Sequence, residues 1–153
     1  MEIIKRIMHP AFKRVLLIAL GLLMIGLAVI VRLTSPAVEL GGQRFGVEVA
    51  DTPAEHQYGL SGRKSLGASH SMLFVFSQPT MTCFWMKDMR FNIDILWFDA
   101  DHKLIHQERD LSPQTYPRQY CPERLTKYVL EVKAGTAEKL GLQDGAELRL
   151  RNL

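Results

Sequence analysis

A run of 17 consecutive uncharged residues, positions 15–31, constrains the fold of this 153-residue chain more than any other feature. At about 1.5 Å per residue, a helix of this run is about 25 Å long, close to the roughly 30 Å hydrocarbon core of a bilayer. The run is apolar on every side, whereas a helix on the core of a soluble protein has a polar face. The sequence therefore predicts one transmembrane helix near the N-terminus.

The charges on either side of this run predict its orientation. Only Arg32 follows it closely, and basic residues precede it at four positions: Lys5, Arg6, Lys13 and Arg14. Because cytoplasmic flanks are enriched in Lys and Arg, we expect the N-terminus to be cytoplasmic. Residues 1–34 are then a cytoplasmic N-terminus and anchor in the inner membrane. Residues 35–153 form a single domain in the periplasm.

A cleaved signal peptide is the alternative interpretation of the same segment. Ser35, Pro36 and Ala37 resemble the small-x-small pattern of a cleavage site. The apolar run is longer than the roughly 7–15 residues of a typical signal peptide, which favours a retained anchor. Both interpretations export the domain.

The charge of the domain argues against nucleic acid as a partner. Subtracting the five basic residues and one acidic residue of positions 1–34 from the chain totals of 19 and 16 leaves 14 basic and 15 acidic residues. A nucleic-acid-binding groove needs clustered Lys and Arg in the folded domain, and no such cluster is visible.

Short apolar runs separated by turn residues predict the fold of the domain. About seven short strands are expected. Residues 37–50 predict a hairpin that turns at Gly41-Gly42, residues 72–76 a buried strand, and residues 93–99, which are apolar on both faces, a central strand. Residues 111–127 predict a long loop, and residues 147–150 the last strand. Residues 52–55 (TPAE) form a capping box with Pro at the first helical position, and Thr136 precedes a second short helix. We expect a mainly β domain with two short helices (α+β), arranged as a small β-barrel-like structure.

Five motifs, in order and at characteristic spacing, carry a family resemblance over about residues 38–151. They are Gly59-Leu60 with Arg63, residues 72–76 (MLFVF), residues 84–87 (FWMK), Asp94-Ile95, and residues 128–131 (YVLE) with Ala134-Gly135. This set resembles domain-of-unknown-function family 192 (DUF192) of bacteria and archaea. The resemblance implies a small β-rich domain behind a signal or anchor, and it implies no activity. The chain departs from the family pattern at Ser61, Ser71, Asp88-Met89 and Ala146.

Polar residues within or beside the apolar motifs are the candidate site. Asp94 and Glu131 lie inside apolar strands, where a carboxylate is costly to bury unless it is paired. Arg63 and Lys87 are natural partners for a bound carboxylate or phosphate, and Trp85 offers a flat face for a ring. The sequence thus predicts a small-ligand or envelope-partner site made of these five residues.

Two other interpretations of this set stay open. The charged residues could form a structural ion-pair network without a ligand. The domain could also be an enzyme acting on envelope carbohydrate or peptide, with Asp94 or Glu131 as acid or base, which requires two carboxylates facing one cleft.

The two cysteines, Cys83 and Cys121, predict a disulfide, because an exported domain folds in an oxidising compartment. Cys83 lies among three methionines, Met81, Met86 and Met89, which makes a Cu(I)-binding protein a further alternative. The histidines show no metal-ligand spacing, and we expect neither a metal nor a cofactor.

Overall fold

The computed structural model describes residues 10–153, and it divides into two units at Ser35 and Pro36. The first unit contains one helix, α1 (Pro10–Thr34). Residues 1–9, where the cytoplasmic N-terminus is expected, lie outside the described residues.

Helix α1 contains one apolar stretch that is long enough to cross a membrane. This stretch, Lys13–Val31, has 19 residues and a mean hydropathy of 2.7, and none of it is buried within the protein. An apolar surface of this length needs an apolar surrounding. A membrane anchor and a signal sequence both have these properties.

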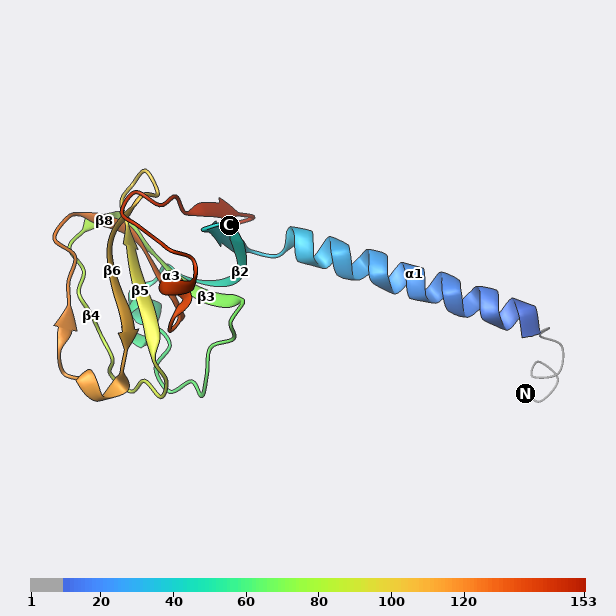
Figure 1. The fold of residues 1–153 in the computed structure, drawn as a ribbon, viewed down its shortest axis with the longest axis horizontal. Coiled ribbons are helices and arrows are strands. Elements are labelled where there is room, and N and C mark those ends of the chain that lie inside the picture. Colours follow the sequence, from blue (N-terminus) through green and yellow to red (C-terminus); the bar gives the residue numbers. More distant parts are fainter. Residues whose placement is uncertain (1–9) are drawn as a thin grey trace. The chain divides into compact units, whose positions relative to one another are not determined.

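The second unit, Pro36–Leu153, is mainly β, as the sequence predicts (Figure 1). Its helical elements are α2 (Pro53–Tyr58), α3 (Thr136–Lys139) and the 3-10 turn η2 (Pro113–Thr115). Its described residues include nine strands: β1 (Ala37–Leu40), β2 (Gln43–Ala50), β3 (His70–Thr80), β4 (Phe84–Trp85), β5 (Ile93–Phe98), β6 (Leu104–Leu111), β7 (Gln119–Tyr120), β8 (Thr126–Lys133) and β9 (Arg149–Arg151).

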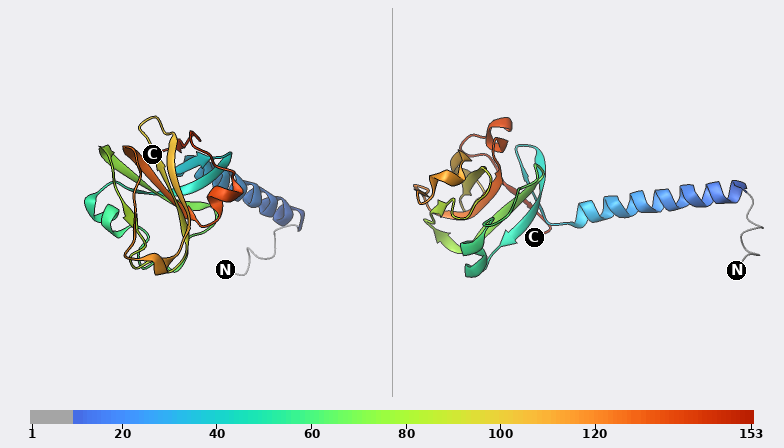
Figure 2. Two further views of the ribbon diagram at one scale, coloured as in Figure 1. Left: turned by 60° about the vertical axis from the view of Figure 1, so that its left-hand side comes forward. Right: turned by 90° about the horizontal axis from the view of Figure 1, so that it is seen from below.

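Seven of these strands form one curled sheet in the order β6-β5-β8-β3-β2-β1-β9 (Figure 2). Its pairs are antiparallel except β2 with β3, which are parallel and joined by a connection containing α2. Strand β5 lies between β6 and β8 and is buried along its whole length, which explains why it is apolar at every position except Asp94. The remaining two strands, β4 and β7, form a separate antiparallel ribbon.

Each face of the sheet packs its own hydrophobic core, because side chains alternate between faces along a strand. One core includes Phe74 of β3 and Trp97 of β5. The other includes Leu73 and Leu96, their neighbours in sequence. Because of this alternation, only polar residues on the same face of the sheet can contribute to one site.

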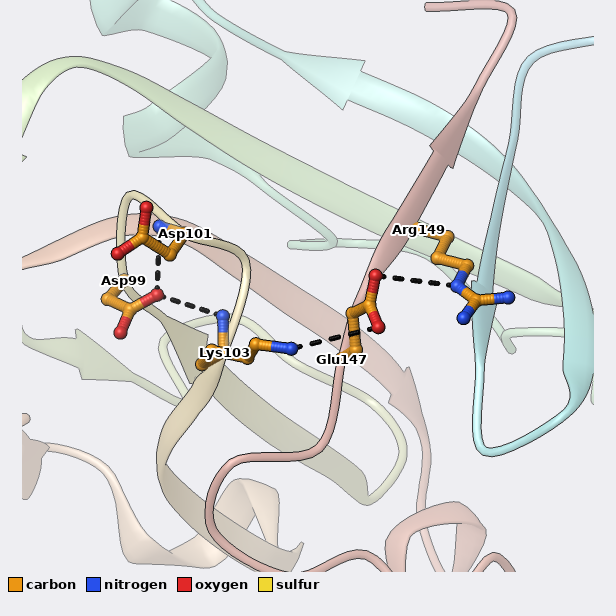
Figure 3. A network of polar contacts seen from close by, with 5 residues as sticks. All are labelled: Asp99, Asp101, Lys103, Glu147 and Arg149. Carbon is orange, nitrogen blue, oxygen red and sulfur yellow. Dashed lines mark hydrogen bonds and ion pairs between the residues drawn. The ribbon is translucent and has the colours of Figure 1, made fainter.

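A seam between β6 and the segment before β9 joins the two ends of the curled sheet. Leu104 N donates to the Ala146 carbonyl at 2.8 Å, and Leu148 N donates to the His102 carbonyl at 2.9 Å. Figure 3 shows the polar network at this seam, where Lys103 Nζ lies 3.7 Å from Glu147 Oε2. In the same network Asp99 Oδ1 accepts from the backbone N–H groups of Asp101 and Lys103 and so fixes the turn between β5 and β6.

The structure corrects three details of the expected strands. Strand β3 runs over His70–Thr80 rather than residues 72–76, because its polar ends still pair with β2 and β8. The segment expected to be one long loop after Leu111 contains η2 and β7. The last strand is Arg149–Arg151 rather than residues 147–150, because residues 146–148 bond to the seam instead.

Candidate binding pocket at Glu131

Glu131 is a buried carboxyl group in the middle of the sheet. It lies in β8, opposite Met72 of β3 and Ile95 of β5, and only 5 % of its surface is exposed. Its Oε2 is buried and has no hydrogen-bond partner among the described residues. Burial, opposed in part by the charge of Arg63, raises the pKa of Glu131 to about 8.

A cavity of about 80 Å³ opens beside Glu131. Its walls come from α2 and the turn after it, from β3, and from the β4 segment, and they combine aromatic with polar side chains. The lining residues are His56, Gln57, Tyr58, Gly59, Leu60, Ser61, Phe74, Phe76, Thr82, Cys83, Phe84, Trp85, Met89 and Glu131.

The aromatic walls are held by contacts between rings. Phe84 meets Phe74 edge to face, with ring centroids 4.9 Å apart, and His56 packs on Phe76 at 4.6 Å. The His56 ring is oriented because its Nε2, 3.0 Å from the Ala50 carbonyl oxygen, must be the N–H that donates to it. Trp85 is 44 % exposed, as expected for a side chain at the rim.

Helix α2 is positioned by the capping box that the sequence predicts. Glu55 N donates to Thr52 Oγ1 at 3.3 Å, and Thr52 N donates to Glu55 Oε2 at 3.0 Å. The Thr52 hydroxyl, followed by the backbone N–H groups of Thr52 and Asp51, donates to the Glu55 carboxylate and lowers the pKa of Glu55. Gly59 then ends the helix with φ +50° and ψ −132°, and a Cβ there would lie 3.2 Å from Phe74 Cζ. Glycine therefore lets the chain turn directly against the pocket wall.

The β4–β7 ribbon carries the opposite wall, and the predicted disulfide joins its two strands. Phe84 pairs with Tyr120, and Cys83 is bonded to Cys121 one residue further along. The buried indole of Trp97 donates to the Thr82 carbonyl at 3.3 Å. The ribbon that presents Phe84 and Trp85 is therefore fixed both covalently and through the core.

Arg63 lies next to this pocket, but its charge is already paired. Its Nη1 and Nη2 donate to the two carboxylate oxygens of Glu48 at 2.6 and 2.8 Å. This bidentate pair lowers the pKa of Glu48 and raises that of Arg63. Arg63 lines a neighbouring hollow with Glu48 and Met72, and it reaches Glu131 only through its electric field.

Lys87 contributes its backbone rather than its side chain. Its carbonyl accepts a hydrogen bond from Ser61 Oγ at 3.0 Å, and the Asp88 carbonyl accepts from Gly62 N at 2.9 Å. These bonds join the turn after α2 to the segment after β4, so two walls of the pocket are tied together. The Lys87 side chain is exposed and does not line the cavity.

Asp94 lies on the opposite face of the sheet from Glu131. It pairs in register with Val132, whereas Ile95 pairs with Glu131. Its Oδ1 accepts from Asp110 N at 2.8 Å and Gly135 N at 3.2 Å, and its Oδ2 accepts from Ala137 N at 2.8 Å. Asp94 therefore orients the start of α3 and the end of β6.

Of the five predicted site residues, the structure brings Glu131 and Trp85 together in one cavity, places Arg63 beside it and leaves Lys87 and Asp94 outside it. The two carboxylates that an acid–base pair would need face different sides of the sheet. Cys83, proposed among soft Cu(I) ligands, is bonded to Cys121, and Met86 is 1 % exposed in the core. Among residues 10–153 there is no group of three or more His, Cys, Asp or Glu placed to hold a metal.

Sequence reasoning missed most of the aromatic wall. The sequence pattern predicts a buried strand at Phe74 and Phe76 and a short helix at His56 and Tyr58, but it does not show that these residues line one cavity. The alternation of side chains along β3 could have identified this wall. Met72, Phe74 and Phe76 lie on the same face of the sheet as Glu131.

The curled sheet makes this a small, mainly β domain of the barrel-like class, and its pocket contains a single carboxyl group, Glu131. Within that class the chain belongs to the DUF192 family, described as "Uncharacterized ACR", whose model matches residues 37–150. This confirms the resemblance and its extent. The matched segment contains every residue of the pocket.

Two crystal structures resemble the domain. One is of a protein of unknown function from Novosphingobium aromaticivorans, which is 28 % identical, has a TM-score of 0.69 and aligns over 74 % of this chain and 81 % of that one. The other, from Sinorhizobium meliloti, carries the provisional description of a transcription regulator; it is 28 % identical, with a TM-score of 0.72 over 77 % of this chain and 95 % of that one. No curated protein sequence matches the chain.

Proposed function

We propose that this protein is a membrane-anchored binding protein whose periplasmic domain holds a small ligand in the Glu131 pocket. The observation that carries the proposal is the buried, unpartnered Oε2 of Glu131 beside an aromatic cavity. A buried polar group without a partner costs about 1–3 kcal/mol, and a ligand that supplies the missing hydrogen bond or charge recovers that cost. Concave pockets that combine aromatic side chains with polar groups that can orient a ligand are typical of small-molecule sites.

Export is supported by two independent features of the chain. The apolar stretch of α1 follows a basic N-terminal segment, which favours a cytoplasmic N-terminus. The domain contains a disulfide, and such bonds persist mainly in oxidising compartments. Together they favour a single-pass protein of the inner membrane.

Location can be tested with C-terminal reporter fusions. We expect an alkaline phosphatase fusion after Leu153 to be active and a fluorescent-protein fusion that folds only in the cytosol to be dark. The intact mass of the protein in the membrane fraction then separates an anchor from a cleaved signal peptide. An active cytosolic reporter would refute export.

The description of the Sinorhizobium meliloti protein does not favour a regulatory role here. Regulation of transcription through DNA contact requires a concentration of basic residues on the folded domain. The domain has 14 basic and 15 acidic residues, and Arg63, Arg149 and Arg151 are each engaged by a Glu carboxylate.

The binding function can be tested by NMR on residues 36–153. This unit has its own cores, and the Sinorhizobium meliloti relative aligns over 95 % of its length to it, so it is a reasonable folding unit. A library of several hundred fragments should contain molecules that shift the Trp85 indole and the Gly59 and Ser61 amides. The Gly135 and Ala137 amides, which bond Asp94 on the other face, serve as the internal control. A library that leaves the pocket signals unmoved would refute the proposal.

A further inference from the structure

The charges around the pocket restrict what it can hold. Among its lining residues Glu131 is the only carboxyl group, and none is Lys or Arg. The nearest cation, Arg63, is held by Glu48 in a bidentate pair, and the Lys87 side chain is exposed outside the cavity. An anionic ligand would therefore meet no free cation there, whereas a cationic ligand would meet an unpaired carboxyl.

The walls have the chemistry that stabilises an organic cation. Aromatic faces carry negative partial charge, and a cation within about 6 Å of such a face gains about 0.5–2 kcal/mol. Phe74, Phe84 and Tyr58 line the cavity, and the exposed Trp85 adds an indole, the best partner of this kind, at its rim.

The size of the cavity fits a small head group. Its volume of about 80 Å³ lies well below the roughly 300–1,000 Å³ of pockets for drug-sized ligands. A compact group such as a methylated ammonium can be enclosed, with any remaining part of the molecule passing the rim at Trp85.

We propose, resting on the binding function above, that the Glu131 pocket recognises a small organic cation of the alkylammonium type. The carboxylate of Glu131 pairs with the positive charge, and the aromatic walls contact the alkyl groups. Neither the family description nor the related structures assign such a ligand.

The pairing predicts that binding is coupled to a proton. Burial holds the pKa of Glu131 at about 8, so a cation that binds the ionised form must displace a proton at neutral pH. The other titratable groups that line the cavity are His56 and Tyr58 of α2. The charge that acts on Glu131 is Arg63, itself paired with Glu48 of β2. Affinity should rise up to about tenfold per pH unit below 8 and level off above it.

The test compares choline with its uncharged isostere 3,3-dimethyl-1-butanol, by calorimetry on residues 36–153 at pH 8.5. We expect choline to bind at least tenfold more tightly, and pivalate, an anion of similar shape, not to bind. In Glu131→Gln the preference for choline and its pH dependence should both disappear. Trp85→Leu, a change at an exposed position, should weaken choline more than the alcohol.

The outcomes separate this inference from the binding function. Equal affinity for choline and the alcohol, or a preference for pivalate, would refute the inference that the ligand is a cation. The proposal of a small-molecule site would still stand. Choline binding that Glu131→Gln leaves unchanged would place the cation elsewhere and also overturn the inference. If choline does not bind while library fragments shift the pocket signals, the cation inference is refuted and the binding function is kept. If neither binds, both proposals fall.

Discussion

Asp94 and Glu131 are buried carboxyl groups on neighbouring strands, one residue out of register, and they have opposite surroundings. Asp94 accepts hydrogen bonds from three backbone N–H groups, whereas the buried Oε2 of Glu131 accepts none from the described residues, and Glu131 lines a cavity. Backbone donors compensate a buried charge, and a bare cavity does not. The contrast teaches that burial alone does not identify a functional carboxyl: the saturated one holds the fold together, and the unsatisfied one is available to a ligand.

The largest expected effect on stability comes from removing Asp94, the carboxyl group whose hydrogen bonds are all made. Asp94→Ala removes the acceptor for three buried backbone donors and should lower the free energy of unfolding by about 4 kcal/mol. Glu131→Gln at pH 6, where Glu131 is neutral and makes no hydrogen bond, is the matched control and should change it by less than about 1 kcal/mol. Urea unfolding of residues 36–153 measures both. Similar losses for the two variants would contradict the comparison.

The disulfide should stabilise the Glu131 side by a smaller amount. Replacing Cys83 and Cys121 by Ser opens a loop of 38 residues and should cost about 3–4 kcal/mol in unfolding free energy. The β4–β7 ribbon carries Phe84 and Trp85, so ligand affinity should fall as well. Wild-type protein kept in a thiol reductant is the control and should show the same loss. Unchanged fragment shifts at Trp85 in the Ser variant would show that the bond does not shape the pocket.

The pH dependence of stability tests whether Glu131 is buried without a partner. Glu131 in the unfolded chain loses its proton near pH 4.5, and in the folded domain it keeps the proton until about pH 8. The folded state therefore binds more protons in this window, and stability falls as pH rises through it. Relative to Glu131→Gln, the wild type should lose about 2 kcal/mol between pH 6 and 8. Equal pH profiles in urea titrations would show that Glu131 is already ionised or paired.

The smallest effect concerns the wall that closes the pocket. Thr52→Ala removes the capping hydrogen bond at the start of α2 and should cost about 1 kcal/mol. Thr52→Ser keeps the hydroxyl and is the control. Amide exchange should speed up in α2 and stay unchanged at Ala137, beside Asp94. Faster exchange at both places would mean that the two faces of the sheet are not independent.

Local sequence predicted several parts of this structure well. The capping box at Thr52, the hairpin of β1 and β2, the buried central strand β5 and the pairing of Cys83 with Cys121 all follow from residues close together or from the scarcity of alternatives. Sequence also identified Asp94 and Glu131 as unusual, because a carboxylate inside an apolar strand is costly wherever it lies.

The site was harder to predict, because its membership depends on register. A shift of one residue along β5 or β8 moves a side chain to the other face of the sheet. The two apolar strands predict one site for Asp94 and Glu131, but the pairing of Ile95 with Glu131 places the two carboxyl groups on opposite faces. The sequence predicts that Arg63 is available to a ligand. Its bidentate pair is with Glu48, 15 residues away, which lies outside the five family motifs, so the motifs do not reveal the pair.

By itself the sequence determined the apolar N-terminal helix, the mainly β class and the family, since these depend on local periodicity and composition. Only the tertiary structure decided which carboxyl is saturated, which cation is already paired and which rings surround Glu131. Those properties depend on contacts between strands distant in sequence, and the physical reason is that side-chain direction alternates at every residue while pairing register is set by the whole sheet.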